Sequence, residues 1–311
     1  MHIPDGFLDT KVIAATVALA AIGVGAAWRQ TKKQLPQRKI PLLGLAAAFV
    51  FAAQMLNFPV AGGTSGHLLG AVLISVLLGP HATVIVMTVV LVVQCFLFAD
   101  GGVLALGANV FNMALMGTLV GNAIYRGVLH LLGGERGKIA AVAVASWGSV
   151  MVAALCCAGE LSWSGTVPWQ TAFPAMAGIH AIIGIGEAVI ACLVIAAIRK
   201  TRPELLAVNS DPLPGKAVAT VIVYGVVIAL GLVLFVSPFA SPWPDGLEAV
   251  AARLGFDRQA LAHPLLPSLI PGYKFPGLDS ATLATIAAGI AGVLVVVVLV
   301  TFLSRRLKGK A

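Results

Sequence analysis

Residues 281–303, ATLATIAAGIAGVLVVVVLVTFL, decide the fold class, because no charged side chain interrupts this apolar run. A helix needs about 20 such residues to cross the hydrocarbon core of a bilayer. Eight further apolar runs are predicted as helices, the third of them short enough to be an incomplete span buried among its neighbours: 11–28, 40–57, 66–79, 81–99, 108–129, 139–159, 174–198 and 217–236. The sequence therefore predicts an all-α polytopic membrane protein.

The composition excludes most other classes of protein. Of 311 residues, 59% are hydrophobic and only 10% are charged, and the mean hydropathy is +0.99. A soluble domain carries roughly 25% charged residues, so an ordinary soluble enzyme and a disordered chain are both excluded. The long apolar runs also disfavour a membrane β-barrel, whose strands alternate. The four cysteines lie inside apolar runs, and we expect buried thiols rather than disulfides or a metal cluster: Cys95, Cys156, Cys157 and Cys192.

The basic residues orient the chain. The net charge of +8 would suggest nucleic acid in a soluble protein, but membrane proteins gather Lys and Arg in cytoplasmic loops. With the N-terminus outside and the C-terminus inside, all but four of the 20 Lys and Arg residues are cytoplasmic, the exceptions being Lys11, Arg253, Arg258 and Lys274. We therefore expect this orientation, and no nucleic-acid partner.

Two modules are predicted. A seven-helix bundle spans residues 1–200, and a polar cytoplasmic linker with three prolines spans 201–216. A two-helix module follows over 217–311, and its helices flank an extracytoplasmic loop domain at 237–280.

Polar residues within the apolar runs gather toward the outer side, where we expect a functional site, because such residues are costly in hydrocarbon. Singly, each could simply hydrogen-bond between helices. They are Gln54, Asn57, His67, Gln94, Asp100, Asn109, Asn112 and His180. Glu187 is deeper, seven residues after His180, and so lies on the same helix face two turns away.

The N-terminus has the pattern of a metal chelator. The α-amine of Met1, the deprotonated amide of His2 and the His2 imidazole can close two fused chelate rings around one ion. One further imidazole would complete a planar set of four nitrogens, which suits Ni(II) or Cu(II). His67 is the best candidate for that donor. We expect Thr64 or Ser65 to cap a helix that His67 opens, whose positive end keeps the imidazole neutral.

Four motifs carry a family resemblance. They are MHIPDG at 1–6, GGTSGHLLG at 62–70, LFADGG at 97–102 followed by LGANVFNMA at 106–114, and HAIIGIGE at 180–187. Residues 1–200 resemble the cobalt/nickel substrate-capture component of energy-coupling-factor transporters, the CbiM/NikM type. The remainder resembles the small companion subunit, the CbiN/NikN type, through PDGLE at 244–248. The chain thus looks like a fusion of two subunits.

The resemblance implies that Met1, His2 and His67 bind the metal. It leaves open whether four other residues orient these ligands or only hold loops: Asp100, Asn109, His180 and Glu187. It also leaves open whether Asp245 and Glu248 contact metal or only begin a helix. Ni²⁺ or Co²⁺ would be the transported substrate, with no resident cofactor, and the bacterial cytoplasmic membrane would be the location. The types of ligand do not decide between nickel and cobalt. The planar site and the companion module favour nickel.

An energy source must come from partners if transport is active. No Gly-Lys pair of the chain has the spacing of a phosphate-binding loop. The resemblance implies a transmembrane coupling subunit and two ATP-binding subunits. Small residues four apart in the first helix could pack against such a partner or within this chain: Ala14, Ala18, Ala21, Gly23, Gly25 and Ala27.

Two other functions remain open at the level of sequence. An intramembrane metalloenzyme could use His180 and Glu187 as acid and base. A passive channel or exchanger would carry metal by this chain alone, although channels use several weak sites rather than one tight chelate.

Overall fold

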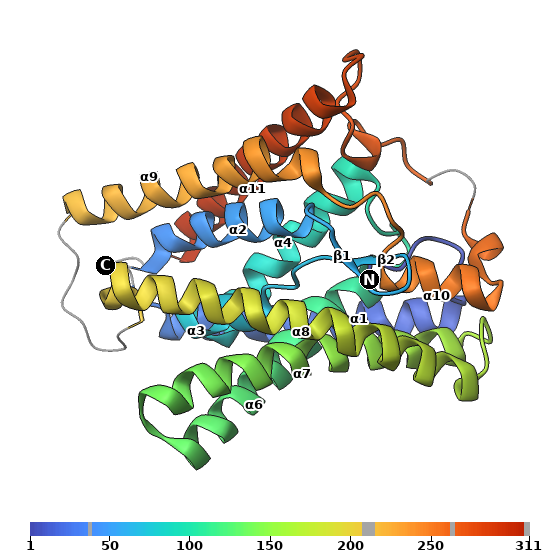
Figure 1. Cartoon of the computed structure of the whole chain (residues 1–311), viewed down its shortest axis with the longest axis horizontal. Helices are drawn as coiled ribbons and strands as arrows, with labels where there is room; N and C mark the ends of the chain where they lie inside the picture. The colour runs from blue at the N-terminus through green and yellow to red at the C-terminus, as the bar shows by residue number, and fades with distance from the viewer. Residues whose placement is uncertain (37–38, 207–214, 262–264, 308–311) are drawn as a thin grey trace.

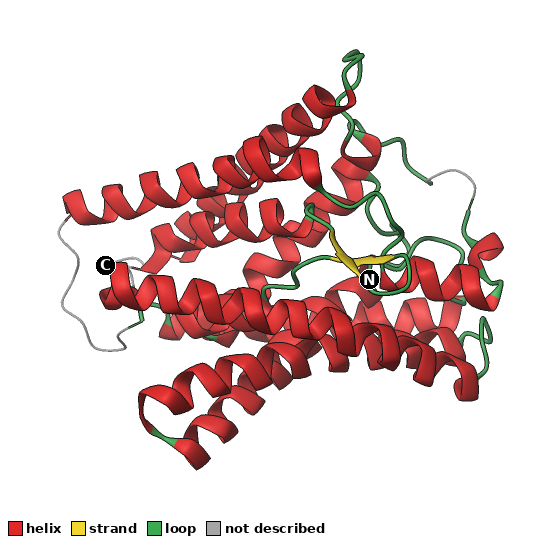
Figure 2. Cartoon of the chain, in the orientation of Figure 1, coloured by secondary structure: helices red, strands yellow, loops and turns green. Residues whose placement is uncertain are grey.

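A computed structural model describes the chain except residues 37–38, 207–214, 262–264 and 308–311 (Figure 1). Helices make up nearly all of its regular structure, as the sequence predicts (Figure 2). The main helices are α1 (Thr10–Gln34), α2 (Ile40–Gln54), α3 (Ala71–Leu78), α4 (Pro80–Phe98), α6 (Gly117–Leu132), α7 (Gly134–Trp163), α8 (Trp169–Thr201), α9 (Gly215–Gly231), α10 (Gly246–Leu254) and α11 (Ala281–Leu307).

Five of the described helices are long and apolar enough to cross a membrane: α1, α4, α7, α8 and α11. The α2 helix and residues 223–239 are apolar but shorter. All four cysteines are free thiols; Cys95 and Cys157 are buried as expected, whereas Cys156 and Cys192 are only partly buried. These features confirm a polytopic helical membrane protein.

The predicted helix over 66–79 is wrong at its beginning. Strand β2 (Thr64–Gly66) pairs antiparallel with β1 (Phe58–Val60), and α3 begins only at Ala71. Gly62 and Gly63 both have positive φ, so they turn the chain back into a hairpin instead of leading into a helix. Eight helical residues span only about 12 Å, so α3 is an incomplete span whose side chains are mostly buried.

This hairpin changes the expected setting of His67. The residue lies between β2 and α3 and does not open a helix, and neither Thr64 nor Ser65 caps one. The Ser65 amide donates to the Pro244 carbonyl over 2.8 Å, and the Ser65 hydroxyl donates to the Trp243 carbonyl over 2.7 Å. The backbone of β2 is thus paired with the second module rather than with a helical turn.

The predicted helix over 108–129 contains an irregularity near its beginning. A short helix, α5 (Leu106–Asn109), leads into a π-helical segment, Val110–Met116, before α6 continues. Such segments often occur at functional sites. Here the segment turns the Asn112 amide toward Glu160 on α7, with 2.6 Å between Nδ2 and Oε2.

The C-terminal module packs along the N-terminal bundle. Helix α11 lies against α2 and α4, and α9 lies beside α2 (Figure 1). Between α9 and α11 the chain folds back over the end of the bundle that holds the N-terminus, where α10 contacts α8 and β2. Asp245 and Glu248 form the capping box that begins α10. Most of the predicted linker at 201–216 lies outside the described residues.

The small residues of α1 divide between two faces. Gly23 lies against the Leu115 side chain and Ala27 is buried, so this pair packs within the chain. A second set, Ala14, Ala18, Ala21 and Gly25, is exposed on the outer surface of the helix.

Candidate metal site

Backbone contacts hold the first five residues inside the protein. The Ile3 amide donates to Asn109 Oδ1 over 2.8 Å, and the Ile3 carbonyl accepts from Asn109 Nδ2 over 3.1 Å and from the Gly102 amide over 2.8 Å. The Asp5 carboxylate accepts from the amides of Val103 and Leu104. The N-terminal segment is therefore fixed by the loop that joins α4 to α5 and by Asn109 at the end of α5.

This close approach requires glycine in the loop. A Cβ on Gly102 would lie 2.3 Å from the Asp5 backbone nitrogen, and a Cβ on Gly101 would lie 2.8 Å from Asn109 Nδ2. Any side chain at Gly102 would push the N-terminal segment away. The LFADGG motif thus has a steric role beneath the N-terminus.

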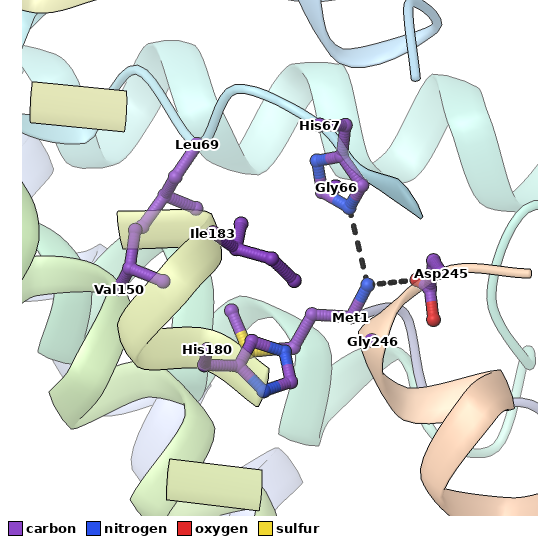
Figure 3. A pocket seen from close by; sticks show the side chains of 9 residues that line it. All are labelled: Met1, Gly66, His67, Leu69, Val150, His180, Ile183, Asp245 and Gly246. Atoms are coloured by element: carbon purple, nitrogen blue, oxygen red, sulfur yellow. Dashed lines mark hydrogen bonds and ion pairs between the residues drawn. The ribbon is translucent and has the colours of Figure 1, made fainter. Parts of the chain in front are cut away.

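The nitrogen of Met1 lies between a histidine and a carboxylate. Its distance to His67 Nε2 is 3.1 Å, and it also forms an ion pair with Asp245 (Figure 3). His67 Nδ1 faces the Leu68 carbonyl oxygen at 3.3 Å. The proton of the neutral His67 ring therefore belongs on Nδ1, so the lone pair of Nε2 is directed at Met1.

The His2 ring lies beside that of His67. Their centroids are 5.3 Å apart and the two rings are inclined by 29°. His2 Nδ1 is 3.1 Å from Asp100 Oδ1, and His2 Nε2 is 3.3 Å from Gln94 Oε1. Tyr273 of the second module donates its hydroxyl to Asp100 over 2.5 Å. Next to these groups is a polar cavity of about 220 Å³, which His2, His67, Asp100 and Tyr273 help to line.

Burial keeps both imidazoles neutral. Burial, together with the neighbouring N-terminal ammonium, lowers the pKa of His67 to about 3. Burial also lowers the pKa of His2, although the Asp100 carboxylate opposes the change. For Asp245, burial would raise the pKa, but the N-terminal ammonium and His67 outweigh it and hold the pKa below its usual range. The site thus offers neutral imidazole nitrogens beside the ionised carboxylate of Asp245.

Helix α8 contributes His180 and Glu187, both buried on one face as the seven-residue spacing predicts. Glu187 accepts from the amides of Leu69 and Gly70 over 2.6 and 2.8 Å, so it holds the loop that follows His67. His180 lines a small cavity together with Met1 and His67. Since both Glu187 oxygens are bound to backbone amides, the arrangement does not support the acid–base pair of an enzyme.

Seven of the residues that sequence reasoning proposed lie close together, whereas Asn112 of the expected polar cluster is bound to Glu160 instead. Met1, His2 and His67 meet at the centre, while Asp100, Asn109, His180 and Glu187 surround them. Within the described ranges, no three His, Cys, Asp or Glu side chains are grouped to bind a metal ion. A metal site here would have to use main-chain nitrogen as well.

Sequence reasoning missed two contributions. Tyr273 gave no signal, because no pattern connects an outer-loop tyrosine to an aspartate far away in the chain. Asp245 was considered only together with Glu248, as a metal contact or as the beginning of a helix, and its contact with Met1 could not be read from the sequence.

Comparison with known proteins identifies both modules. The family model described as the cobalt uptake substrate-specific transmembrane region, CbiM, matches residues 2–205. The PDGLE domain model matches residues 219–309. A putative fused nickel transport protein NikMN from Archaeoglobus fulgidus is 35% identical over 307 residues, which cover 98% of each chain.

Further relatives agree with these matches. The fused nickel transport protein NikMN from Rhodobacter capsulatus is 35% identical over 227 residues, covering 68% of this chain and 65% of that protein. The crystal structure of a transition metal transporter superposes with a TM-score of 0.59 at 36% identity, covering 64% of this chain and 93% of the other.

The relatives are transport proteins, which agrees with a transporter component and not with an enzyme. The CbiM match at residues 2–205 includes the buried N-terminal segment and the glycine-containing loop beneath it. This chain is therefore a multi-pass membrane protein of the CbiM family, joined to a PDGLE domain.

Proposed function

We propose that this chain is the substrate-binding membrane subunit of an ATP-driven nickel or cobalt importer. The metal is chelated by the Met1 amine, the His2 amide and imidazole, and the His67 imidazole. The observation that carries the proposal is the 3.1 Å contact between the Met1 nitrogen and His67 Nε2 in a buried setting.

That distance is compatible with two neighbouring ligands of one ion. Metal–nitrogen bonds of about 2.0–2.1 Å at a right angle put two donor nitrogens about 2.9 Å apart. Met1 and His67 therefore need to move little to accept a metal in the plane. His2 needs to turn its Nδ1 from Asp100 toward the same centre, with Gln94 Oε1 available to accept the proton on Nε2.

The two carboxylates stabilise the metal-free state. Asp245 compensates the positive charge of the Met1 ammonium, and the Asp100 carboxylate is in contact with His2 Nδ1. Metal binding releases a proton from the amine and one from the amide, because only the deprotonated nitrogens are ligands. The same relation gives a route to release, since reprotonation of these nitrogens expels the ion.

The direction of transport and its energy belong to the proposal as well. The N-terminus and the metal site lie on the outer side of the cytoplasmic membrane and the C-terminus lies inside, as the basic residues favour. A transmembrane coupling subunit and two ATP-binding subunits supply the energy. Residues 1–200 form the capture domain, and 217–311 form the companion module whose outer segment covers the site.

The names of the relatives and the proposed donor atoms are both consistent with nickel as a substrate. One relative is named as a fused nickel transport protein, another as a putative fused nickel transport protein, and a third as a putative cobalt transport protein. A planar set of four nitrogens suits nickel. We therefore propose nickel as the preferred substrate and cobalt as the second.

The test replaces the one donor that lies outside the N-terminal segment. Purified His67→Ala is expected to lose stoichiometric Ni(II) binding in calorimetry, and cells that express it with the partner subunits are expected to lose uptake of radiolabelled nickel. His130→Ala is the matched control, since His130 is exposed in the last turn of α6. Unchanged affinity in His67→Ala would refute the ligand assignment, and net uptake by this chain without ATP-binding partners would refute the proposed energy source.

A further inference from the structure

His180 presents a nitrogen that no described residue engages. Its Nδ1 lies 2.8 Å from the carbonyl oxygen of Met176, one turn earlier in α8. A carbonyl oxygen only accepts, so the proton of the neutral ring is on Nδ1 and the lone pair is on Nε2. His180 is 1% exposed, and no hydrogen-bond partner for Nε2 is found in the described part of the chain.

The His180 ring lies at the metal site. It lines a cavity of about 10 Å³, room for roughly one water molecule, together with Met1, His67 and Asp245. Figure 3 shows the ring beside Met1, on the opposite side of that residue from His67. The remaining wall is apolar or glycine and consists of Gly66, Leu69, Val150, Ile183 and Gly246.

The absence of a side chain at Gly246 leaves space next to His180 Nε2. A Cβ at position 246 would lie 2.8 Å from His180 Nε2, so any other residue there would crowd this nitrogen. An imidazole that gives its one N–H to a backbone carbonyl and keeps the other nitrogen bare has the geometry of a metal-ligating histidine. The bare nitrogen, the cavity and the glycine together indicate a donor position.

We propose that His180 Nε2 is a fifth nitrogen donor, which binds the metal from outside the plane of the four nitrogens. The proposal rests on the proposed function and adds a residue that selects between metals. Low-spin Ni(II), with eight d electrons, gains little from a donor along the axis of a four-nitrogen plane. Co(II), with seven, binds an axial base in such a plane. His180 therefore strengthens the binding of cobalt more than that of nickel.

The test compares the two metals on the purified full-length chain. Wild type, His180→Leu and His180→Gln are titrated with Ni(II) and Co(II) in competition, and X-ray absorption counts the nitrogens around bound cobalt. His130→Leu controls for the loss of a histidine away from the site. We expect five nitrogens around cobalt in wild type and four in either variant, with the cobalt-to-nickel affinity ratio lowered about tenfold or more.

Each outcome decides the matter. Four nitrogens around cobalt in wild type would overturn the role of His180, even if neither variant folded. Five nitrogens that persist in the variants would assign the fifth donor to another residue. A ratio that stays at the wild-type value would mean that Nε2 only binds a water molecule. If the proposed function itself were wrong, the result would be distinguishable from these outcomes, because the wild-type protein would then bind neither metal stoichiometrically.

Discussion

Among individual residues, the Met1 amine, His2 Nδ1 and His67 Nε2 each already face a polar group. Met1 faces His67 and Asp245, and His2 faces Asp100. The proposed ligands could be named from the sequence because the chelate uses neighbouring atoms of two adjacent residues, and the motif at 62–70 offers the remaining donor. The carboxylate that faces Met1 could not be predicted, since it lies 244 residues away in the chain.

The loop after His67 depends on Glu187. In Glu187→Gln, one of the two backbone amides of Leu69 and Gly70 would face an NH₂ group instead of an acceptor. We expect nickel affinity to fall by about 10- to 100-fold, as for other residues that orient metal ligands. Calorimetry on the purified variant measures this effect, and Glu135→Gln on the exposed part of α7 is the control. Wild-type affinity would show that the loop holds His67 without the carboxylate.

The pH dependence of nickel binding reports which nitrogens lose protons. Because burial lowers the pKa of His67 to about 3 and also lowers that of His2, both imidazoles are neutral near pH 7 and take up no proton there. The amine and the amide each release one proton, so affinity should weaken as the pH falls. Between about pH 6.5 and 7.5 the dissociation constant should rise about 100-fold per unit decrease in pH. A pH-independent constant over this range would exclude both nitrogens as ligands.

Among the elements, long apolar runs were predicted well and the short outer elements were not. Helices α4 and α11 begin within a residue of their predicted positions, because burial in a membrane demands continuous hydrophobicity. The β-hairpin was missed, since its pairing depends on a glycine turn and on the distant backbone of Trp243 and Pro244. Residues close in sequence carry no signal for such contacts.

The glycine loop beneath the N-terminal segment can be tested by adding one methyl group. In Gly102→Ala the new Cβ would lie 2.3 Å from the Asp5 backbone nitrogen and the same distance from its side-chain Oδ1. Overpacking of this kind costs about 1–3 kcal/mol, and here it displaces the ligands. We expect weakened nickel binding by calorimetry, whereas Gly25→Ala, which has open space around its Cβ, should bind as wild type. Equal affinities in the two variants would mean that the segment is held elsewhere.

At the scale of the whole molecule, the second module covers the N-terminal segment of the first. It supplies Asp245 to Met1, Tyr273 to Asp100, and backbone acceptors to Ser65. The sequence predicted two modules from the proline-containing segment between them. It could not predict that the outer segment folds against the site, because charge and hydropathy do not encode the docking of one module on another.

The two modules should therefore assemble without a covalent link. When residues 1–206 and 215–311 are produced as separate chains in the same cells, we expect them to co-purify and to bind nickel with wild-type affinity. The physical reason is the packing of α11 along α2 and α4 together with the outer contacts. Pull-down through a tag on the C-terminal piece measures assembly. Pieces that never associate would show that the contacts seen here depend on the linker.

The most direct test of the N-terminal chelate measures how much nickel binding depends on His67 in two backgrounds. One alanine inserted between Met1 and His2 lets the amine, two amides and the imidazole fill all four planar positions without another residue. In the wild-type background, His67→Ala should weaken Ni(II) binding by at least about 100-fold, whereas in the insertion background it should change affinity by less than about threefold. An equal loss of affinity in both backgrounds would contradict the chelate.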